Sequence, residues 1–108
     1  MCGIAGCITE REISHSEIEK LLKLMRNRGP DSGNYKKFNF GNKLIYLFHT
    51  RLKILDLNPR SDQPFLKNDI CLIYNGEIYN YIELRKDLET KGHSFFTTSD
   101  TEVLMNAY

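Results

Sequence analysis

The stretch YKKFNFGNKLIYLF, residues 35–48, predicts the central feature of the fold. Two segments rich in apolar and aromatic residues, Tyr35–Phe40 and Lys43–Phe48, flank the dipeptide Gly41-Asn42. A glycine and an asparagine between two such segments favour a β-hairpin, because both residues tolerate the left-handed backbone of a tight turn. We therefore expect two antiparallel strands that are joined at Gly41-Asn42.

The N-terminus predicts a strand that begins beside a reactive residue. Gly3–Ile8 is short, apolar and compatible with a buried strand, so Cys2 lies at its start. Removal of Met1 would leave a thiol and a free α-amine on the same residue. An N-terminal amine can be the base that activates such a nucleophile, and its pKa of roughly 8 leaves part of it unprotonated near neutrality. Cys2 is therefore a candidate nucleophile that needs no histidine, although a small residue can also occupy position 2 by chance.

A helix is predicted between this strand and the hairpin. Ser14-x-x-Glu17 and Ser16-x-x-Glu19 are overlapping capping boxes, in which serine and glutamate side chains satisfy free amides at a helix N-terminus. The segment Arg28-Gly29-Pro30-Asp31-Ser32-Gly33 then breaks the chain. The apolar face of the helix is expected to consist of Ile18, Leu21, Leu22 and Met25.

The chain after the hairpin predicts further short strands and helices. Strands and helices mixed in this way, with hairpins, indicate an α+β fold with a largely antiparallel sheet. The last helix has no stop signal before Tyr108, which indicates a chain that is incomplete at its C-terminus. The expected elements, in order, are a polar loop over Asn58–Pro64, a strand over Ile70–Tyr74, a helix from an Asn80 cap to Gly92, a strand over Phe95–Thr98, and a helix opened by the capping box of Ser99 and Glu102.

Composition limits the classes of protein to consider. The 108 residues make one domain at most, and fifteen basic against fourteen acidic residues give a net charge of +1. This balance gives no reason to expect a nucleic-acid partner. No apolar run approaches the roughly 20 residues that cross a bilayer. Glu10 and Arg11 interrupt the N-terminal apolar stretch too early for a signal peptide, so no membrane partner is expected either.

The three cysteines indicate a reducing compartment, and we expect a cytoplasmic protein. Cys2, Cys7 and Cys71 show no C-x2-C spacing, and the chain has no histidine pair at ligand spacing, so a zinc site is not expected. Cys7 and Cys71 lie in apolar stretches and are predicted to be small core residues.

Four short segments concentrate polar residues and glycines where packing alone would not require them. They are Cys2-Gly3-Ile4, Arg28-Gly29-Pro30-Asp31, His49-Thr50-Arg51-Leu52 and Asn75-Gly76-Glu77-Ile78-Tyr79-Asn80, and Asp100 follows. Taken singly, each has an ordinary explanation, such as a hairpin turn, a surface charge or a helix cap. Together and in this order they resemble the glutaminase domain of class II glutamine amidotransferases, the enzymes with an N-terminal cysteine nucleophile. Within that class the resemblance is strongest to glutamine-hydrolysing asparagine synthetases, and it covers the whole chain.

The resemblance implies hydrolysis of L-glutamine to glutamate and ammonia through a thioester on Cys2. The side-chain amide of Asn75 and the main-chain N–H of Gly76 would form the oxyanion hole. The guanidinium of Arg51 suits the α-carboxylate of the substrate, and Asp100, together with Glu77, suits its α-ammonium. No metal and no cofactor are implied for this step. The implied glutamine-binding residues are Arg51, Leu52, Ile54, Asn75, Gly76, Glu77 and Asp100.

The resemblance also implies the layered fold and the larger protein. The fold would be of the N-terminal-nucleophile (Ntn) hydrolase type, with αββα layers of antiparallel sheets, here incomplete at the C-terminus. Residues 1–108 would be the N-terminal part of a glutaminase domain. A synthetase domain of the same enzyme, absent from this chain, would bind ATP and Mg and use the ammonia to make asparagine from aspartate. The full-length form could be a homodimer.

The sequence leaves several alternatives open. The ammonia acceptor could be a sugar or a cell-surface precursor, because the residues that select it lie outside this chain. The chain could also be an inactive fragment or a binding module. Arg28–Asp31 is expected to form either the wall beside the nucleophile or only a turn that ends the helix. His49 is expected to be structural, at the end of a strand, and would be the first suspect as the base if Met1 were retained.

Overall fold

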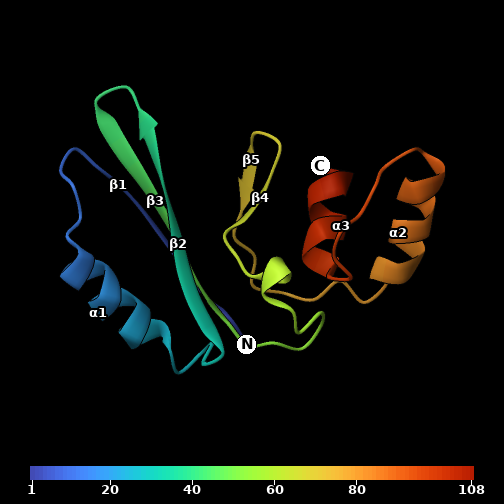
Figure 1. Cartoon of the computed structure of the whole chain (residues 1–108), viewed down its shortest axis with the longest axis horizontal. Helices are drawn as coiled ribbons and strands as arrows, with labels where there is room; N and C mark the ends of the chain where they lie inside the picture. Colours follow the sequence, from blue (N-terminus) through green and yellow to red (C-terminus); the bar gives the residue numbers. More distant parts are fainter.

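A computed structural model describes all residues of the chain, 1–108, which form two parts of different construction (Figure 1). The first part is a three-stranded sheet with helix α1 against it. The second part consists of the β4–β5 hairpin with helices α2 and α3. In Figure 1 the two parts stand side by side and are joined at the lower end, where the N-terminus also lies.

The three-stranded sheet confirms the predicted hairpin and the predicted first strand. Its strands are β1 (Gly3–Thr9), β2 (Ser32–Phe40) and β3 (Lys43–Arg51), in the order β1-β3-β2. Both outer strands run antiparallel to β3, and both pair a glycine, Gly3 or Gly33, with Thr50. Gly41 adopts the left-handed conformation at φ +60° that the turn requires. Because the start of β1 lies beside the end of β3, Cys2 is brought to the same end of the sheet as Arg51.

Helix α1 (His15–Met25) begins with the predicted capping box. The Glu17 N–H donates to the Ser14 hydroxyl, and the Ser14 N–H donates to the Glu17 carboxylate at 2.9 Å. The helix buries its apolar face against the sheet, where the rings of Tyr46 and Phe48 stack with centroids 6.0 Å apart. The predicted helix face is confirmed, since Ile18, Leu21, Leu22 and Met25 all belong to this core.

The second part is built from shorter elements. These are a 3-10 turn (Pro59–Ser61), β4 (Phe65–Lys67), β5 (Ile70–Leu72), α2 (Tyr81–Thr90) and α3 (Asp100–Ala107). The strand predicted over Ile70–Tyr74 is confirmed for its first three residues only. Helix α2 begins directly after Asn80, whose side chain makes no capping hydrogen bond, and Gly92 follows its end at φ +90°.

The prediction of a strand over Phe95–Thr98 is wrong. No strand includes these residues, because carboxylates take their main-chain amides instead of a neighbouring strand. The N–H groups of Phe96 and Thr97 donate to Glu102, at 3.2 and 2.7 Å. The predicted capping box of α3 is confirmed in one half: the Ser99 hydroxyl accepts the Glu102 N–H, but the Glu102 carboxylate does not return to Ser99.

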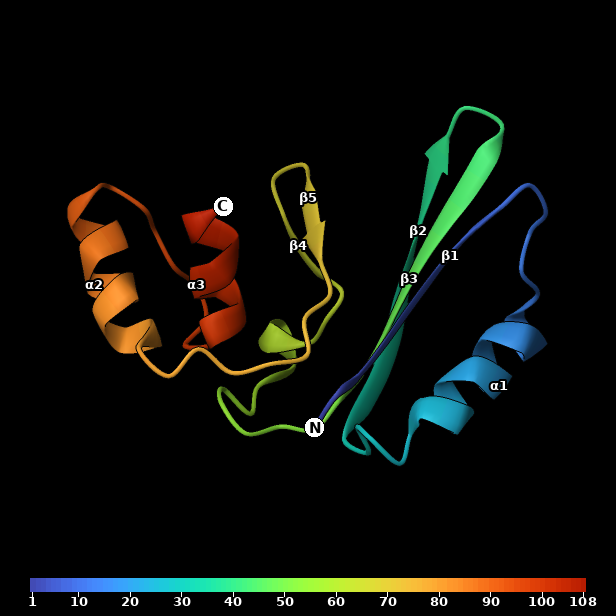
Figure 2. The ribbon, with the colours of Figure 1, turned by 180° about the vertical axis from the view of Figure 1, so that it is seen from behind.

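The architecture is therefore a mixed α/β domain with two antiparallel sheets. Seen from behind, α1 lies on one side of the three-stranded sheet, and the β4–β5 hairpin lies on the other side, followed by α3 and α2 (Figure 2). None of the helices has the length and apolar character needed to cross a bilayer.

Candidate active site

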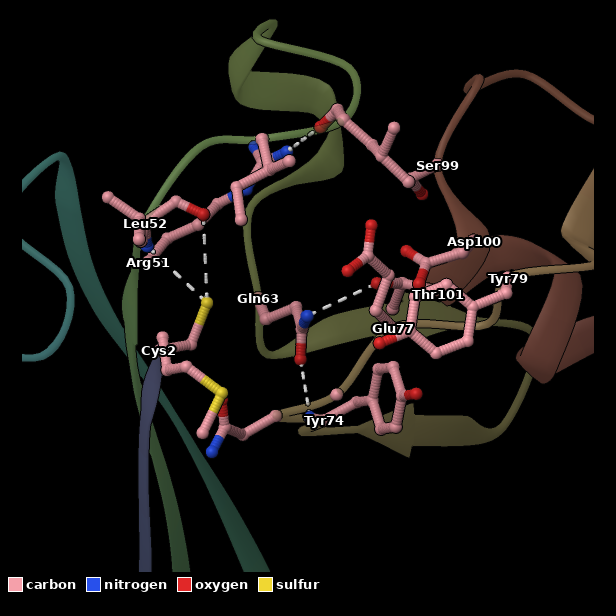
Figure 3. A pocket seen from close by; sticks show the side chains of 15 residues that line it. Cys2, Arg51, Leu52, Gln63, Tyr74, Glu77, Tyr79, Ser99, Asp100 and Thr101 are labelled. Carbon is pink, nitrogen blue, oxygen red and sulfur yellow. Dashed lines mark hydrogen bonds between the residues drawn. The ribbon is translucent and has the colours of Figure 1, made fainter.

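A cavity of about 320 Å³ lies where the two parts of the molecule meet (Figure 3). Four segments form its walls: the N-terminus, the end of β3 with the loop after it, the segment after β5, and the start of α3. The fold thus brings together residues that are far apart in the sequence. Every residue predicted for the site lines this cavity, namely Cys2, Arg51, Leu52, Ile54, Asn75, Gly76, Glu77 and Asp100.

The Cys2 thiol is held at the end of the sheet by the chain that follows β3. Its Sγ accepts the Leu52 N–H at 3.4 Å and lies 3.8 Å from the Leu52 carbonyl oxygen. The Arg28 Nε donates to the main-chain carbonyl of Cys2 at 3.2 Å. Met1 precedes Cys2 and also lines the cavity. Leu52 thus holds the thiol and Arg28 holds the main-chain carbonyl of Cys2, at a position that lines the cavity.

The segment Arg28–Asp31 supports this end of the sheet without lining the cavity. A Cβ at Gly29 would lie 2.2 Å from the main chain of Thr50, so only glycine fits there. The Asp31 N–H donates to the Arg51 carbonyl at 3.0 Å, and the Asp31 carboxylate accepts the Lys53 N–H at 2.7 Å. Apart from the Arg28 contact to Cys2, the segment stabilises the end of strand β3.

The guanidinium of Arg51 is buried, and both of its terminal nitrogens are engaged by the loop that follows β3. One terminal nitrogen donates to the carbonyls of Leu55 and Asp56, at 2.7 and 2.6 Å. The other donates to the Asn58 carbonyl at 3.2 Å and forms an ion pair with Asp62 at 2.7 Å. A two-pronged contact with a substrate carboxylate would require some of these bonds to be exchanged.

The carboxylates of Asp100 and Glu77 make the side of the cavity opposite Cys2 acidic (Figure 3). Asp100 is the first residue of α3, and its carboxylate accepts the Ile78 N–H at 3.0 Å. This bond ties the start of α3 to the segment that carries Glu77. Burial, and secondly the charges of Asp100 and Glu77, raise the pKa of the nearby Tyr74 hydroxyl. Such an environment suits a cationic group of a ligand.

Asn75 and Gly76 line the same cavity and directly precede Glu77 in the chain. The Asn75 side chain makes no hydrogen bond within the chain, so its amide can serve a ligand. A Cβ at Gly76 would lie 2.4 Å from the Tyr74 hydroxyl oxygen, which means that glycine allows the segment to fold closely around that ring. Both residues follow the last residue of β5 and have no strand partner.

The sequence did not reveal other residues that line the cavity, among them Gln63. Its buried side-chain amide links Tyr74 to Thr101, which are 11 and 38 residues away in the chain. No spacing rule identifies contacts of this kind. His49 lies outside the cavity lining, with Nε2 3.2 Å from the Tyr74 carbonyl oxygen, and burial lowers its pKa. This position agrees with the expected structural role.

The chain has no group of three or more His, Cys, Asp or Glu side chains that could hold a metal ion. All three cysteines are free. Burial raises the pKa of the Cys71 thiol, which makes it a poor nucleophile near neutrality. Cys2 is the cysteine that faces the cavity.

Comparison with known proteins assigns the family. The family model described as the glutamine amidotransferase domain matches residues 1–108. Asparagine synthetase [glutamine-hydrolysing] 1 of Bacillus subtilis is 41% identical, and the protein of the same name from Arabidopsis thaliana is 44% identical. Asparagine synthetase [glutamine-hydrolysing] of Brassica oleracea is 41% identical. Each match covers 100% of this chain but only 17% or 18% of the relative. The chain belongs to the glutamine amidotransferase domain family.

Proposed function

We propose that this domain hydrolyses L-glutamine to L-glutamate and ammonia, with Cys2 as the nucleophile. The observation that carries the proposal is that the thiol, two amide donors and two carboxylates line one cavity. A thiol beside hydrogen-bond donors is suited to acyl transfer, because the donors can stabilise the oxyanion that forms. The family to which the chain belongs supports the same reaction.

The proposed reaction begins after Met1 is removed. The Cys2 sulfur bonds to the side-chain amide carbon of glutamine, and the thiol proton passes through the α-amine of Cys2 to the amide nitrogen. The carbon–nitrogen bond then breaks, ammonia leaves, and a thioester remains. Water adds to the thioester carbon, the carbon–sulfur bond breaks, and glutamate is released as the thiol is restored. Asn75 and Gly76 would hold the oxyanion in both halves of the reaction.

The head group of glutamine would lie between the two sides of the cavity. Asp100 and Glu77 would receive the α-ammonium, since both line the acidic side. Arg51 would receive the α-carboxylate by exchanging its contact with Asp62 for the substrate. Leu52 and Ile54 would line the space between the head group and Cys2. No metal or cofactor takes part in this step of the proposal.

We further propose that the ammonia serves ATP-dependent asparagine synthesis from aspartate. The names of the relatives support this use, and the small share of each relative that the chain covers leaves room for a synthetase domain. That domain would bind ATP and Mg. A cytoplasmic location is part of the proposal and is supported by the three free cysteines. The homodimer expected from the resemblance stays a prediction.

The Ntn-hydrolase layering is also a proposal, with residues 1–108 as the N-terminal part of the glutaminase domain. In an αββα arrangement a second sheet covers the face of the first sheet that is opposite its helix. Ile4 and Ile8 point to the face of β1 that is opposite α1, and they are 49% and 67% exposed. Further strands packed on this face would bury both side chains.

Intact-mass spectrometry of the protein, before and after exposure to a diazoketone analogue of glutamine, tests the proposed reaction. We expect a protein that lacks Met1 and gains one adduct, the mass of the analogue less dinitrogen, at Cys2. The Cys2→Ala variant is the matched control, because it keeps Cys7 and Cys71. An adduct on either of those cysteines, or hydrolysis of glutamine by the Cys2→Ala variant, would contradict the proposal.

A further inference from the structure

The main chain of Tyr74, the residue before the two amide donors, is held by side chains instead of a neighbouring strand. Strand β5 ends at Leu72, so the main chain of Tyr74 has no ladder partner. Its N–H donates to the side-chain oxygen of Gln63 at 2.5 Å, and its carbonyl lies 3.2 Å from His49 Nε2. Polar main-chain groups away from water need such partners. Two side chains from different segments thus hold the two main-chain polar groups of Tyr74, the residue before Asn75.

Gln63 connects the Tyr74 N–H to the acidic side of the cavity. Because the Tyr74 N–H can only donate, the side-chain oxygen of Gln63 must face it, and the side-chain nitrogen must face Thr101. That nitrogen lies 3.2 Å from the Thr101 hydroxyl, and both hydrogen bonds are drawn in Figure 3. Thr101 directly follows Asp100 in α3. Gln63 lines the cavity, but both ends of its amide are engaged by the protein.

His49 holds the main-chain carbonyl of the same residue, Tyr74. The side chain is fully buried, and burial lowers its pKa, so the ring is neutral near neutral pH. A carbonyl oxygen can only accept, which places the single ring proton on Nε2, facing Tyr74. Nδ1 is buried and has no partner. The ring is thus a hydrogen-bond donor to the main chain and is not directed at the cavity.

We infer that Gln63 and His49 are positioning residues for glutamine hydrolysis: they clamp the main chain of Tyr74, Gln63 at its N–H and His49 at its carbonyl, and thereby fix Asn75 and Gly76 relative to Cys2 and Asp100. This inference rests on the proposed function. An oxyanion donor is effective only within about 2.7–3.1 Å of the developing charge. A displacement of about 1 Å can lower the rate by about 100-fold. Loosening of the clamp should therefore act on the chemical step more than on substrate binding.

Paired substitutions separate the clamp from simple packing. Gln63→Met and His49→Met keep the approximate size of the side chain and remove the hydrogen bonds. Gln63→Glu keeps an acceptor for the Tyr74 N–H, and His49→Gln places an amide donor near the position of Nε2. We expect each Met variant to lower kcat by about 10- to 100-fold with KM within about 2-fold. The conservative variants should recover most of that loss.

The assay measures glutamine hydrolysis by the intact protein, with active sites titrated by the diazoketone so that kcat refers to folded enzyme. His15→Gln is the matched control for His49→Gln, because His15 lies exposed on α1. If a Met variant does not fold, Thr101→Val replaces it: this change removes only the acceptor for the Gln63 amide, and we expect kcat to fall by about 3- to 10-fold.

Three results would overturn the inference in different ways. If the Met variants have fewer active sites that react with the diazoketone but keep the same kcat per reactive site, the clamp contributes only to stability. A His49→Gln variant as inactive as His49→Met, together with loss of the acidic limb of the pH–rate profile, would assign proton transfer to His49. A wild-type protein that takes up neither glutamine nor the diazoketone would refute the proposed function and the clamp with it.

Discussion

The two parts of the molecule hold their main chains in different ways. In the first part the strands β1, β2 and β3 pair along their whole lengths, and a core of stacked aromatic rings joins them to α1. In the second part, long loops separate short elements, and buried polar side chains bind the loop amides and carbonyls. The side chains that do so are Arg51, Asp56, Gln63, His49 and Glu102.

This difference assigns different tasks to the two parts. A hydrogen-bonded strand ladder and a packed apolar core form a regular support, so the first part serves as a platform for Cys2. A loop fixed by hydrogen bonds from single side chains can present amides and carboxylates to a ligand at defined positions. Asp56 illustrates this, since it takes a left-handed conformation at φ 44° while its carboxylate accepts the Thr98 N–H at 2.7 Å.

The largest effect on activity is expected at Cys2, the proposed nucleophile, which lies at the end of the platform. Cys2→Ala should lower glutamine hydrolysis by on the order of 10⁴-fold or more, because no other group replaces the nucleophile. The melting temperature should stay within a few degrees, since the thiol makes only weak contacts to Leu52. Steady-state assay and calorimetry of the same samples test both statements.

A companion variant in which Met1 cannot be removed should be almost as inactive. Its α-amine would belong to Met1, and the Cys2 nitrogen would remain in a peptide bond. If this variant hydrolyses glutamine at the normal rate, another group must be the base. His49, a residue of strand β3 outside the cavity lining, would then be the first group to test as the base.

The next largest effect is expected in the platform core. Phe48→Ala should lower the free energy of unfolding by about 3–5 kcal/mol, because the ring is fully buried and stacks on both Tyr46 and Tyr35. Urea titration measures the change. Phe40→Ala is the control: this side chain is 73% exposed in the same sheet, and its loss should cost within about 0.5 kcal/mol. Equal losses of unfolding free energy in the two variants would mean that Phe48 is not part of the core of the platform.

A smaller loss is expected when a carboxylate of the second part is neutralised. The Glu102 carboxylate is fully buried and accepts hydrogen bonds from Phe96, Thr97 and Lys67. Glu102→Gln should lower the free energy of unfolding by about 1.5–3 kcal/mol, the range for hydrogen bonds to charged groups. Glu89→Gln on exposed α2 is the matched control, and its loss should be much smaller. Similar urea midpoints for both variants would contradict the stabilising role of the buried Glu102 carboxylate.

The same carboxylate predicts how stability depends on pH. Burial alone would raise the pKa of Glu102, but the hydrogen bonds from Thr97, Lys67 and Phe96 outweigh it and lower the pKa below the usual 4.5. Its contribution to stability is therefore fully present above about pH 4.5 and is lost as the pH falls through the folded-state pKa. Unfolding measured from pH 7 to pH 3 should show a shallower acid decline in Glu102→Gln. An unchanged slope would assign the decline to other carboxylates.

The platform was predictable because its signals are local. The Gly41-Asn42 turn and the Ser14 capping box each act within a few residues, and both are confirmed. The wrong strand over Phe95–Thr98 shows the limit of such signals. The pattern of Ser99 and Glu102 is the same whether the glutamate returns to Ser99 or reaches Thr97. In the structure the glutamate reaches Thr97 and also pairs with Lys67, a contact from outside the pattern.

The predicted site residues came from a resemblance, and the structure brings all of them to one cavity. Their supports could not be predicted in the same way. Gln63 meets Thr101, and Asp56 meets Thr98, across 38 and 42 residues of chain. The engagement of Arg51 by the loop after β3 depends on carbonyls, which every residue has. No residue type or spacing marks such contacts before the fold is known.

The smallest effect gives the sharpest test, because the same substitution can be made in both parts. Ser14→Ala and Ser99→Ala each remove an N-cap hydroxyl that accepts a main-chain N–H, and each should lower the free energy of unfolding by about 1 kcal/mol. Only Ser99 lines the cavity and precedes Asp100, so only its loss should change glutamine hydrolysis, by about 3-fold in kcat/KM. A comparable loss of activity in Ser14→Ala would show that the platform and the site are coupled, since α1 lies on the far side of the sheet from the cavity.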